Sequence, residues 1–103
     1  MPRIEIAEAA QEDLKGIWEY IARYNAEAAN KLIKEIGRKF VTLRDHPLIG
    51  RPRDEILINL RSFVFKDYLI FYQPIDDGIE VLHVLHSSRD IEGMFERFFD
   101  SLE

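Results

Sequence analysis

The residues of this chain that could take part in chemistry are arginines and one histidine near its apolar segments. Arg51, Arg53 and Arg61 lie in or just after a loop, and His86 is followed by Ser87-Ser88-Arg89. A histidine near hydroxyl and guanidinium groups could act as a general acid or base, although no carboxylate is placed to orient it. The arginines could bind a phosphate, a partner's acidic side chain or an acid of their own chain.

The other histidines and the known motifs add no chemistry. His46 is expected at a helix C-terminus, where the helix dipole favours it, and His83 in the core with one hydrogen bond. His83 and His86 are three positions apart in a predicted strand, so they should point to opposite faces and share no ligand. The chain has no cysteine, glycine-rich phosphate loop, zinc spacing or nucleophile motif. We therefore predict no metal, no cofactor and no catalytic residue of these classes.

The distribution of charge argues against a nucleic-acid site. The formal net charge is -5, and residues 47–103 hold eleven acidic and six basic residues. Tight binding to a phosphate backbone depends on many Lys and Arg contacts, so we expect no direct sequence-specific binding of nucleic acid. The loop and strand arginines fit a protein-binding surface better, and Arg51, Arg53 and Arg61 are its candidate residues.

Length and hydropathy predict one compact domain. A chain of 103 residues fits a single domain spanning 1–103. No stretch approaches the roughly 20 apolar residues of a membrane span, and no basic and apolar leader opens the chain. We expect a cytoplasmic protein without a membrane partner.

Apolar periodicity predicts a short strand and two helices in the first half. Residues 3–6 alternate as a strand does, and residues 9–24 place Trp18 on an apolar helical face. Asn25 is expected to cap a second helix, which should end before Pro47. Two long helices with a short joint predict an antiparallel helical hairpin.

The second half predicts strands and a final helix. Residues 60–65, 68–73 and 79–86 are rich in β-branched and aromatic residues, and Asp76-Asp77-Gly78 is a hairpin signal. From Asp90 a terminal helix is expected, with an apolar stripe that includes Phe95, Phe98 and Phe99. The predicted fold is α+β: a small antiparallel sheet packed on an N-terminal helical hairpin, with a C-terminal helix.

The last strand is apolar on both faces. Strict alternation puts Val81 and Leu85 on one face, and Leu82 and Val84 on the other. A sheet that is apolar on both sides needs two covers. The helical hairpin covers one face, and the terminal helix or a partner protein is expected to cover the other. The phenylalanines of that helix are therefore candidate partner contacts.

An ordered set of short motifs covers nearly the whole chain: Asp13-Leu14, Ile17-Trp18, Tyr20-Ile21, Ala28-Ala29, Pro47, Gly50-Arg51, Arg53-Asp54-Glu55, Leu60-Arg61-Ser62, Tyr68-Leu69-Ile70-Phe71-Tyr72, Asp77-Gly78-Ile79-Glu80, Val84-Leu85-His86 and Arg89-Asp90. Taken in this order, the motifs resemble the ParE-type toxins of the RelE/ParE toxin–antitoxin superfamily. The family usually has Ser or Thr just before the first helix, where this chain has Ala7-Glu8, and the missing cap should cost about 1 kcal/mol locally.

The resemblance implies a plasmid-stabilisation type of toxin that inhibits DNA gyrase and is neutralised by a tightly bound ParD-like antitoxin in a hetero-oligomer. It also implies that the antitoxin wraps the toxin over the first-helix surface, which makes Trp18 a candidate partner contact. Two alternatives stay open. One is a RelE-like, ribosome-dependent mRNA endonuclease, for which Arg61, His86 and Arg89 are the only available set of acid, base and phosphate-binding groups. The other is an inactive, toxin-like binding module.

Overall fold

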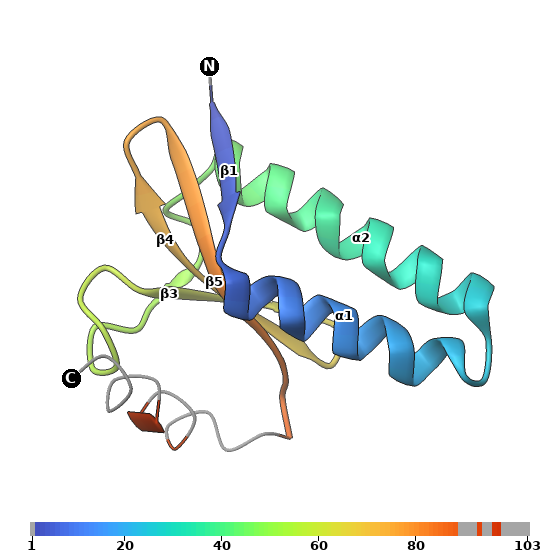
Figure 1. The fold of residues 1–103 in the computed structure, drawn as a ribbon. Coiled ribbons are helices and arrows are strands. Elements are labelled where there is room, and N and C mark those ends of the chain that lie inside the picture. The colour runs from blue at the N-terminus through green and yellow to red at the C-terminus, as the bar shows by residue number, and fades with distance from the viewer. Residues whose placement is uncertain (1, 89–92, 94–95, 98–103) are drawn as a thin grey trace.

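The computed structural model describes residues 2–88 together with residues 93, 96 and 97. The predicted terminal helix lies almost wholly outside the described residues, and so do Arg89, Phe95, Phe98 and Phe99. In chain order the elements are β1 (Arg3–Ile6), α1 (Glu8–Ala22), α2 (Ala26–Asp45), β2 (Arg51–Pro52), β3 (Arg61–Phe65), β4 (Tyr68–Ile75) and β5 (Gly78–His86) (Figure 1).

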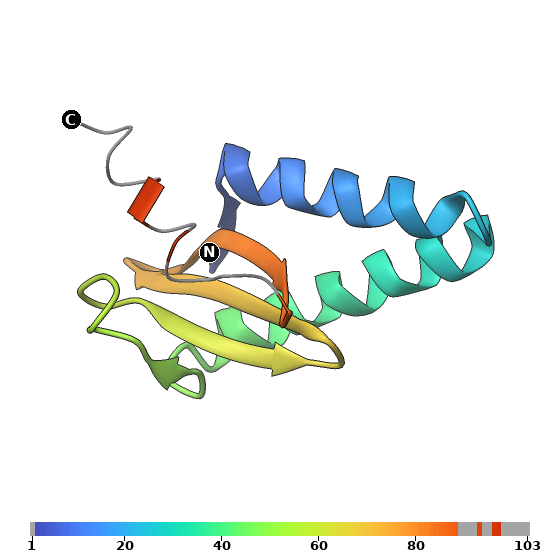
Figure 2. The ribbon, with the colours of Figure 1, turned by 90° about the horizontal axis from the view of Figure 1, so that it is seen from below.

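The strands form one sheet in the order β1-β5-β4-β3-β2. Strands β3, β4 and β5 pair in the antiparallel direction, as predicted. The short β2 lies within the predicted loop and pairs antiparallel with β3, whereas β1 pairs with β5 in the parallel direction. The first strand therefore joins the last one at an edge of the sheet. The helical hairpin lies across one face of the sheet, and the turn between its helices projects beyond the sheet (Figures 1 and 2).

The helix boundaries follow local chemistry. The Asn25 side chain accepts a hydrogen bond from the backbone N–H of Ala28 at 3.0 Å, which confirms the predicted cap of α2. Helix α2 ends two residues before Pro47, with His46 at its C-cap as predicted. Ala7 precedes α1 and provides no side-chain cap.

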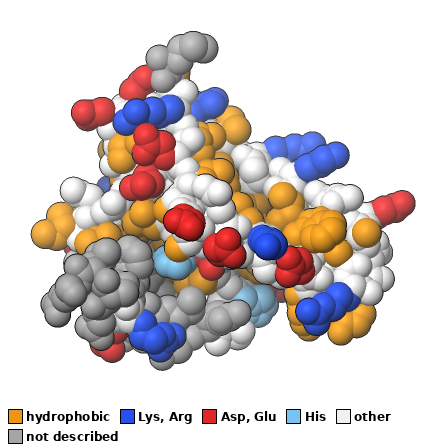
Figure 3. All heavy atoms as spheres, viewed as in Figure 1, with side chains coloured by type: hydrophobic (Ala, Val, Ile, Leu, Met, Phe, Trp, Pro, Cys, Tyr) orange, Lys and Arg blue, Asp and Glu red, His pale blue; other side chains and the backbone are white. Residues whose placement is uncertain are grey.

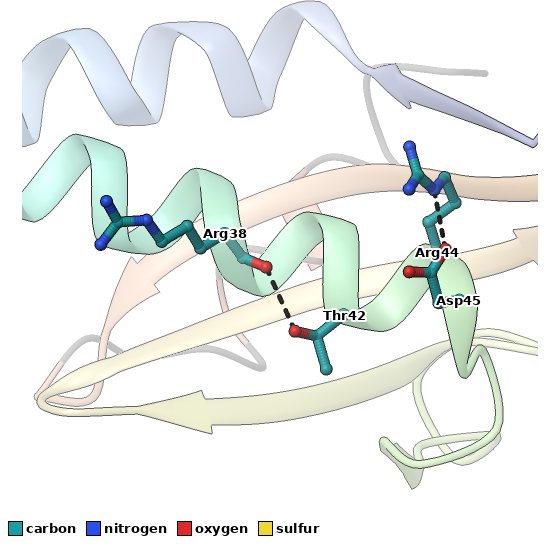
Figure 4. Close-up of polar contacts among 4 residues, drawn as sticks. All are labelled: Arg38, Thr42, Arg44 and Asp45. Atoms are coloured by element: carbon teal, nitrogen blue, oxygen red, sulfur yellow. Dashed lines mark hydrogen bonds and ion pairs between the residues drawn. The ribbon is translucent and has the colours of Figure 1, made fainter.

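The last turns of α2 carry local polar contacts (Figure 4). The Thr42 hydroxyl donates to the carbonyl oxygen of Arg38 at 3.2 Å, and Arg44 Nε lies 3.0 Å from Asp45 Oδ1. A cation in the last turn also suits the negative end of the helix dipole. These residues use their polar groups within the helix, while its other side faces the core.

The main core lies between the hairpin and the sheet. It buries apolar side chains from both helices and from the two central strands: Ala10, Ile36, Phe40, Leu43, Ile70, Tyr72, Ile79, Val81 and Val84. Ile4 and Ile6 of β1 pack against this cluster. Because β1 leads directly into α1, this packing also fixes where α1 begins.

A bulge in β5 corrects the predicted alternation. Pairing passes from Phe71–His83 to Tyr72–Val81, so Leu82 is an extra residue in β5. Val81 and Val84 therefore share the helix-facing side, and strict alternation was wrong here. Leu82 and Leu85 lie on the opposite side.

That opposite side of the sheet has a cover within the chain. Leu60, Phe71 and Leu85 form a second buried cluster, with Ile56 and Leu57 packed against it. Leu60, Ile56 and Leu57 come from the connection between β2 and β3, so this loop supplies part of the cover that was assigned to the terminal helix or a partner.

Candidate functional site

Arg61 is part of a clamp on the loop between α2 and β2. Its Nη1 atom donates to the carbonyl oxygens of Leu48 at 2.9 Å and Gly50 at 2.7 Å. The buried Tyr72 hydroxyl completes the clamp, because it accepts from the Gly50 N–H at 2.9 Å and donates to the Pro47 carbonyl at 2.7 Å. Burial raises the pKa of Tyr72, while the Gly50 N–H and Arg61 partly oppose that rise. The side chain therefore stays a neutral donor at physiological pH.

Arg53 is also engaged within the chain. Its Nε donates to Glu55 Oε2 at 2.9 Å, and this hydrogen bond lowers the pKa of the Glu55 carboxyl. One Nη lies 3.5 Å from the hydroxyl of the buried Ser62, and the guanidinium stacks 5.8 Å from the centre of the Phe71 ring. Arg53 thus holds the loop that covers the second core cluster.

Arg51 is the exposed member of the arginine group. It pairs in register with Ser62 of β3, so the structure brings all three candidate arginines to the same edge of the sheet. The nearby loops also expose large apolar side chains, since Leu48 is 70% exposed and Ile58 is 73% exposed. Among the described residues, this edge thus places the exposed Arg51 beside exposed apolar side chains.

Of the three candidate nuclease residues, Arg89 lies outside the described residues, and the other two lie apart. Arg61 pairs with Tyr72 on β4, whereas His86 pairs with Tyr68 at the other end of the same strand. Four residues at about 3.3 Å each separate these positions by about 13 Å along the strand. His86 instead contacts the Ser88 hydroxyl at 2.7 Å and the Tyr68 ring edge-to-face at 5.5 Å. Arg61 and His86 therefore lie toward opposite ends of β4, which does not favour joint action on one phosphate.

Asp13 of α1 provides a hydrogen-bond partner beside the last residues of β5, where the described residues supply no neighbouring strand on that side. Its Oδ2 atom accepts a hydrogen bond from the Val84 backbone N–H at 3.0 Å and lies 2.7 Å from Nδ1 of His83. A carboxylate only accepts, so Nδ1 of His83 carries the proton in this contact. The hydrogen bond predicted for His83 is confirmed, and its partner comes from 70 residues earlier in the sequence.

We expect Asp13→Ala to lower the free energy of unfolding by about 2–3 kcal/mol, because it removes the carboxylate that accepts from the buried Val84 N–H and that contacts Nδ1 of His83. Asp13→Asn should cost less, since its amide oxygen can still accept from the Val84 N–H. Urea unfolding of both variants measures the difference. Equal stability of the alanine variant and the original chain would contradict the role of Asp13 as an edge cap.

A groove of about 720 Å³ lies next to Asp13, between α1 and the end of β5. Its α1 side includes Glu12, Glu19 and Tyr20, and its sheet side includes Tyr68 and His86. Tyr20 is 64% exposed. Trp18, the predicted partner contact on α1, is 40% exposed and donates its indole N–H to Asn30 on α2 at 2.8 Å. The hairpin thus presents aromatic surface well away from the arginine edge.

Within the described part of the chain, no cluster of three or more His, Asp or Glu side chains could hold a metal ion. No helix among these residues is long and apolar enough to cross a membrane.

The comparison with protein families decides the classification. Residues 4–91 match the model of the ParE toxin of the type II toxin–antitoxin system parDE. The chain belongs to the ParE toxin family. The match runs from β1 through the whole sheet and both helices, so it includes the arginine edge and the groove.

Individual relatives agree with this family. The ParE-family chain is 26% identical to Toxin ParE1 of Caulobacter vibrioides over 89 residues, which is 85% of this chain and 92% of that protein. Its fold matches a solved structure described as the chromosomal ParDE TA system from P. aeruginosa, with a TM-score of 0.70 and 19% identity over 84% of this chain and 96% of that one. The predicted α+β fold and the predicted family are both confirmed.

Sequence reasoning assigned no role to Asp13, Tyr72 or Tyr20 of this ParE-family toxin. Asp13 and Tyr20 stood in the family-like pattern of the first helix, but nothing in their spacing shows that one caps β5 and the other lines a groove. Tyr72 looked like one more aromatic residue of a strand. Only its hydroxyl, which reaches a loop more than twenty residues away, distinguishes it.

Proposed function

We propose that this toxin acts by binding a protein, DNA gyrase, and that a ParD-type antitoxin neutralises it by direct binding in a cytoplasmic hetero-oligomer. Membership of the ParE family supports both partners. The observation that favours a binding mechanism over a catalytic one is the separation of Arg61 from His86 along β4. The candidate arginines are better placed to shape a protein-binding edge than to surround a scissile phosphate.

The proposed target-facing surface is the arginine edge formed by Arg51 with the exposed loop residues Leu48 and Ile58. Arg61 and Arg53 support this edge from within, through hydrogen bonds to loop carbonyls and to Glu55. A rigid, partly apolar surface with one available guanidinium is typical of a protein interface.

We expect the purified toxin to block supercoiling of relaxed plasmid by gyrase, and the antitoxin encoded beside its gene to restore it. Arg51→Glu should weaken this inhibition about tenfold or more without changing thermal stability, because it reverses an exposed charge. The matched control is Lys34→Glu, which reverses the charge of an exposed residue on α2. Lys66→Glu would not serve, because Lys66 pairs with Glu35 at 2.8 Å.

Normal supercoiling at excess toxin would overturn the gyrase proposal. Cleavage of mRNA on programmed ribosomes, lost in Arg61→Ala but retained in Arg51→Ala, would instead establish the endonuclease. A toxin that binds the antitoxin but shows neither activity would be the inactive binding module.

A further inference from the structure

Basic side chains gather on one flank of α2, beside the turn that joins β3 to β4. The helix holds five basic and three acidic residues, although the whole chain has a net charge of -5. Lys66 of the turn reaches α2, where its Nζ lies 2.8 Å from Glu35 Oε2. Lys and Arg side chains project from the α2 side of the molecule in Figure 3. We call the set formed by Lys31, Arg38, Lys39 and Lys66 the basic patch.

The carboxylate of Glu35 does not neutralise the basic patch. The hydrogen bond from Lys66 lowers the pKa of Glu35, and the charges of Lys31 and Arg38 lower it further. Both of these last two residues are exposed, and within the described part of the chain neither forms an ion pair. Even when Asp67 of the turn is counted, four cations face two acids, so two positive charges are in excess.

The Phe65 ring holds two of these cations in place. The ammonium groups of Lys39 and Lys66 lie 5.4 and 5.5 Å from the centre of the ring. Because both groups are so close to one point, they are at most about twice that distance apart. The ring itself packs against the main core, so it is a fixed platform. Two like charges held this close repel each other, and a bound anion would relieve that repulsion.

The make-up of the basic patch favours a chain of phosphates over a protein partner. Protein interfaces centre on buried apolar or aromatic anchors, whereas the Phe65 ring already carries two lysines. Lys31 and Arg38 are seven residues apart on one helix, which is about 10 Å. The Arg38 guanidinium lies along the helix toward its N-terminal turns (Figure 4). A DNA duplex carries one negative charge per about 1.7 Å of its axis, so about six phosphates lie along that length.

The net negative charge of the chain is compatible with such a contact. Charges that are farther apart than a Debye length, about 8 Å at physiological salt, are largely screened. The local excess of cations therefore decides what the patch attracts. Cations that contact phosphates position a protein on DNA but carry no sequence information. The contact is thus consistent with the expectation that this chain does not bind nucleic acid in a sequence-specific way.

We propose that the basic patch binds the phosphate backbone of duplex DNA without reading its sequence. The inference rests on the proposed function only in taking this DNA to be the segment held by gyrase. Strand β3 runs from Arg61, which supports the arginine edge, to the turn that carries Lys66 (Figure 2). The toxin would thus contact gyrase at one end of β3 and the DNA of gyrase at the other.

Fluorescence anisotropy of a labelled duplex of about 30 base pairs, at salt concentrations from about 50 to 200 mM, tests the contact. Each cation that contacts a phosphate adds about 0.9 to the slope of log affinity against log salt. Lys31→Gln should therefore lower the slope by about 1. Lys31→Gln/Arg38→Gln should lower it by about 2 and weaken binding about tenfold at the lowest salt. Thermal unfolding verifies that the variants are folded.

Lys34→Gln is the matched control for Lys31→Gln. It makes the same change three residues away, at an exposed lysine of the same helix whose charge is not among those that act on Glu35. The slope should stay as it is in the original toxin. Equal loss in Lys34→Gln and Lys31→Gln would mean that only the net charge matters, and the inference would be wrong.

The remaining outcomes separate the basic patch from the proposed function. If the original toxin binds the duplex no better than the double variant, the patch inference fails, even for a toxin that inhibits gyrase. Tighter binding to single-stranded RNA of the same length would overturn the assignment to DNA. A double variant that loses affinity for gyrase or the antitoxin in the absence of DNA would identify a protein partner instead. If the patch binds DNA but gyrase is not inhibited, the proposed function fails and the patch inference holds.

Discussion

Replacing Gly78 with alanine is expected to detach β1 from the sheet and to lower the free energy of unfolding by about 3 kcal/mol or more. A Cβ atom at this position would overlap the backbone carbonyl oxygen of Arg3 and lie 2.8 Å from its carbonyl carbon. Both atoms belong to the paired strand, since Arg3 is the register partner of Gly78. Backbone cannot rotate away as a flexible side chain can, so β1 must move.

Urea unfolding measures the loss, and Gly37→Ala is a matched control. Gly37 lies inside α2, where an added Cβ meets no described atom within 4 Å. The same chemical change should there raise the free energy of unfolding by about 0.5–1 kcal/mol, because alanine is the better helix former. Equal effects of the two substitutions would refute the steric explanation.

The consequences of Gly78→Ala should extend to the groove. Arg3 N–H bonds to the Asp77 carbonyl at 2.7 Å, and β1 runs from there to Ala7, where α1 begins. Movement of β1 shifts the start of α1 and with it the Asp13 cap on β5. We therefore expect amide exchange to accelerate at Val84 as well as in β1, and not in β3, which has no contact with β1 in the strand order.

The sequence predicted those parts of the fold that depend on neighbouring residues. Asp77 has a φ of 61°, so the hairpin between β4 and β5 turns where Asp76-Asp77-Gly78 indicated it. Asn25 caps α2 through a residue three positions away. In each case the interacting groups are close in the chain, and their residue types are enough to specify the local geometry.

Long-range pairing and the bulge were beyond such reasoning. Nothing local to residues 3–6 indicates a parallel partner more than seventy residues later. Strict alternation placed Val81 and Val84 on opposite faces of the sheet. Because Leu82 is an extra residue in β5, the two side chains lie on the same face. A period of two carries no information about where a strand gains a residue, because the bulge is set by the match between two strands.

The site showed the same limit. The sequence located the arginines, but the roles of Arg53 and Arg61 depend on Glu55, Phe71 and distant loop carbonyls. Their predicted contacts with a partner remain predictions, as does that of Trp18. Arginine is versatile enough that its partner decides its role, and the partner is known only once the chain is folded.

Tyr72→Phe is expected to lower the free energy of unfolding by about 2–4 kcal/mol at neutral pH, although it removes a single oxygen atom. The ring would keep its place in the core, but the Gly50 N–H and the Pro47 carbonyl would both lose their partner. Tyr24→Phe is the matched control, since that side chain is 79% exposed, and it should change stability by less than about 0.5 kcal/mol.

The original chain and Tyr72→Phe can also be compared as a function of pH. Burial raises the pKa of Tyr72 above its ordinary value of 10.0, so the neutral hydroxyl is favoured in the folded state. A group whose folded pKa is raised contributes stability that is fully present below the unfolded pKa and is lost as pH rises through the folded pKa. The stability gap between the original chain and Tyr72→Phe should therefore be constant up to about pH 10 and narrow above it. Burial also raises the pKa of Tyr68, but both proteins share that effect.

Loss of this hydroxyl should also weaken the proposed target-facing surface. Tyr72 and Arg61 hold the same loop from two sides, and the loop leads directly into Arg51 of β2. With the Tyr72 anchors gone, Arg61 alone fixes the backbone of Gly50, and the arginine edge becomes less ordered. We expect Tyr72→Phe to reduce gyrase inhibition and to leave antitoxin binding over the first-helix surface unchanged at temperatures where the variant is folded. Equal loss of gyrase inhibition and of antitoxin binding would contradict this expectation. The two surfaces lie on separate elements, so only a general loss of structure would affect both.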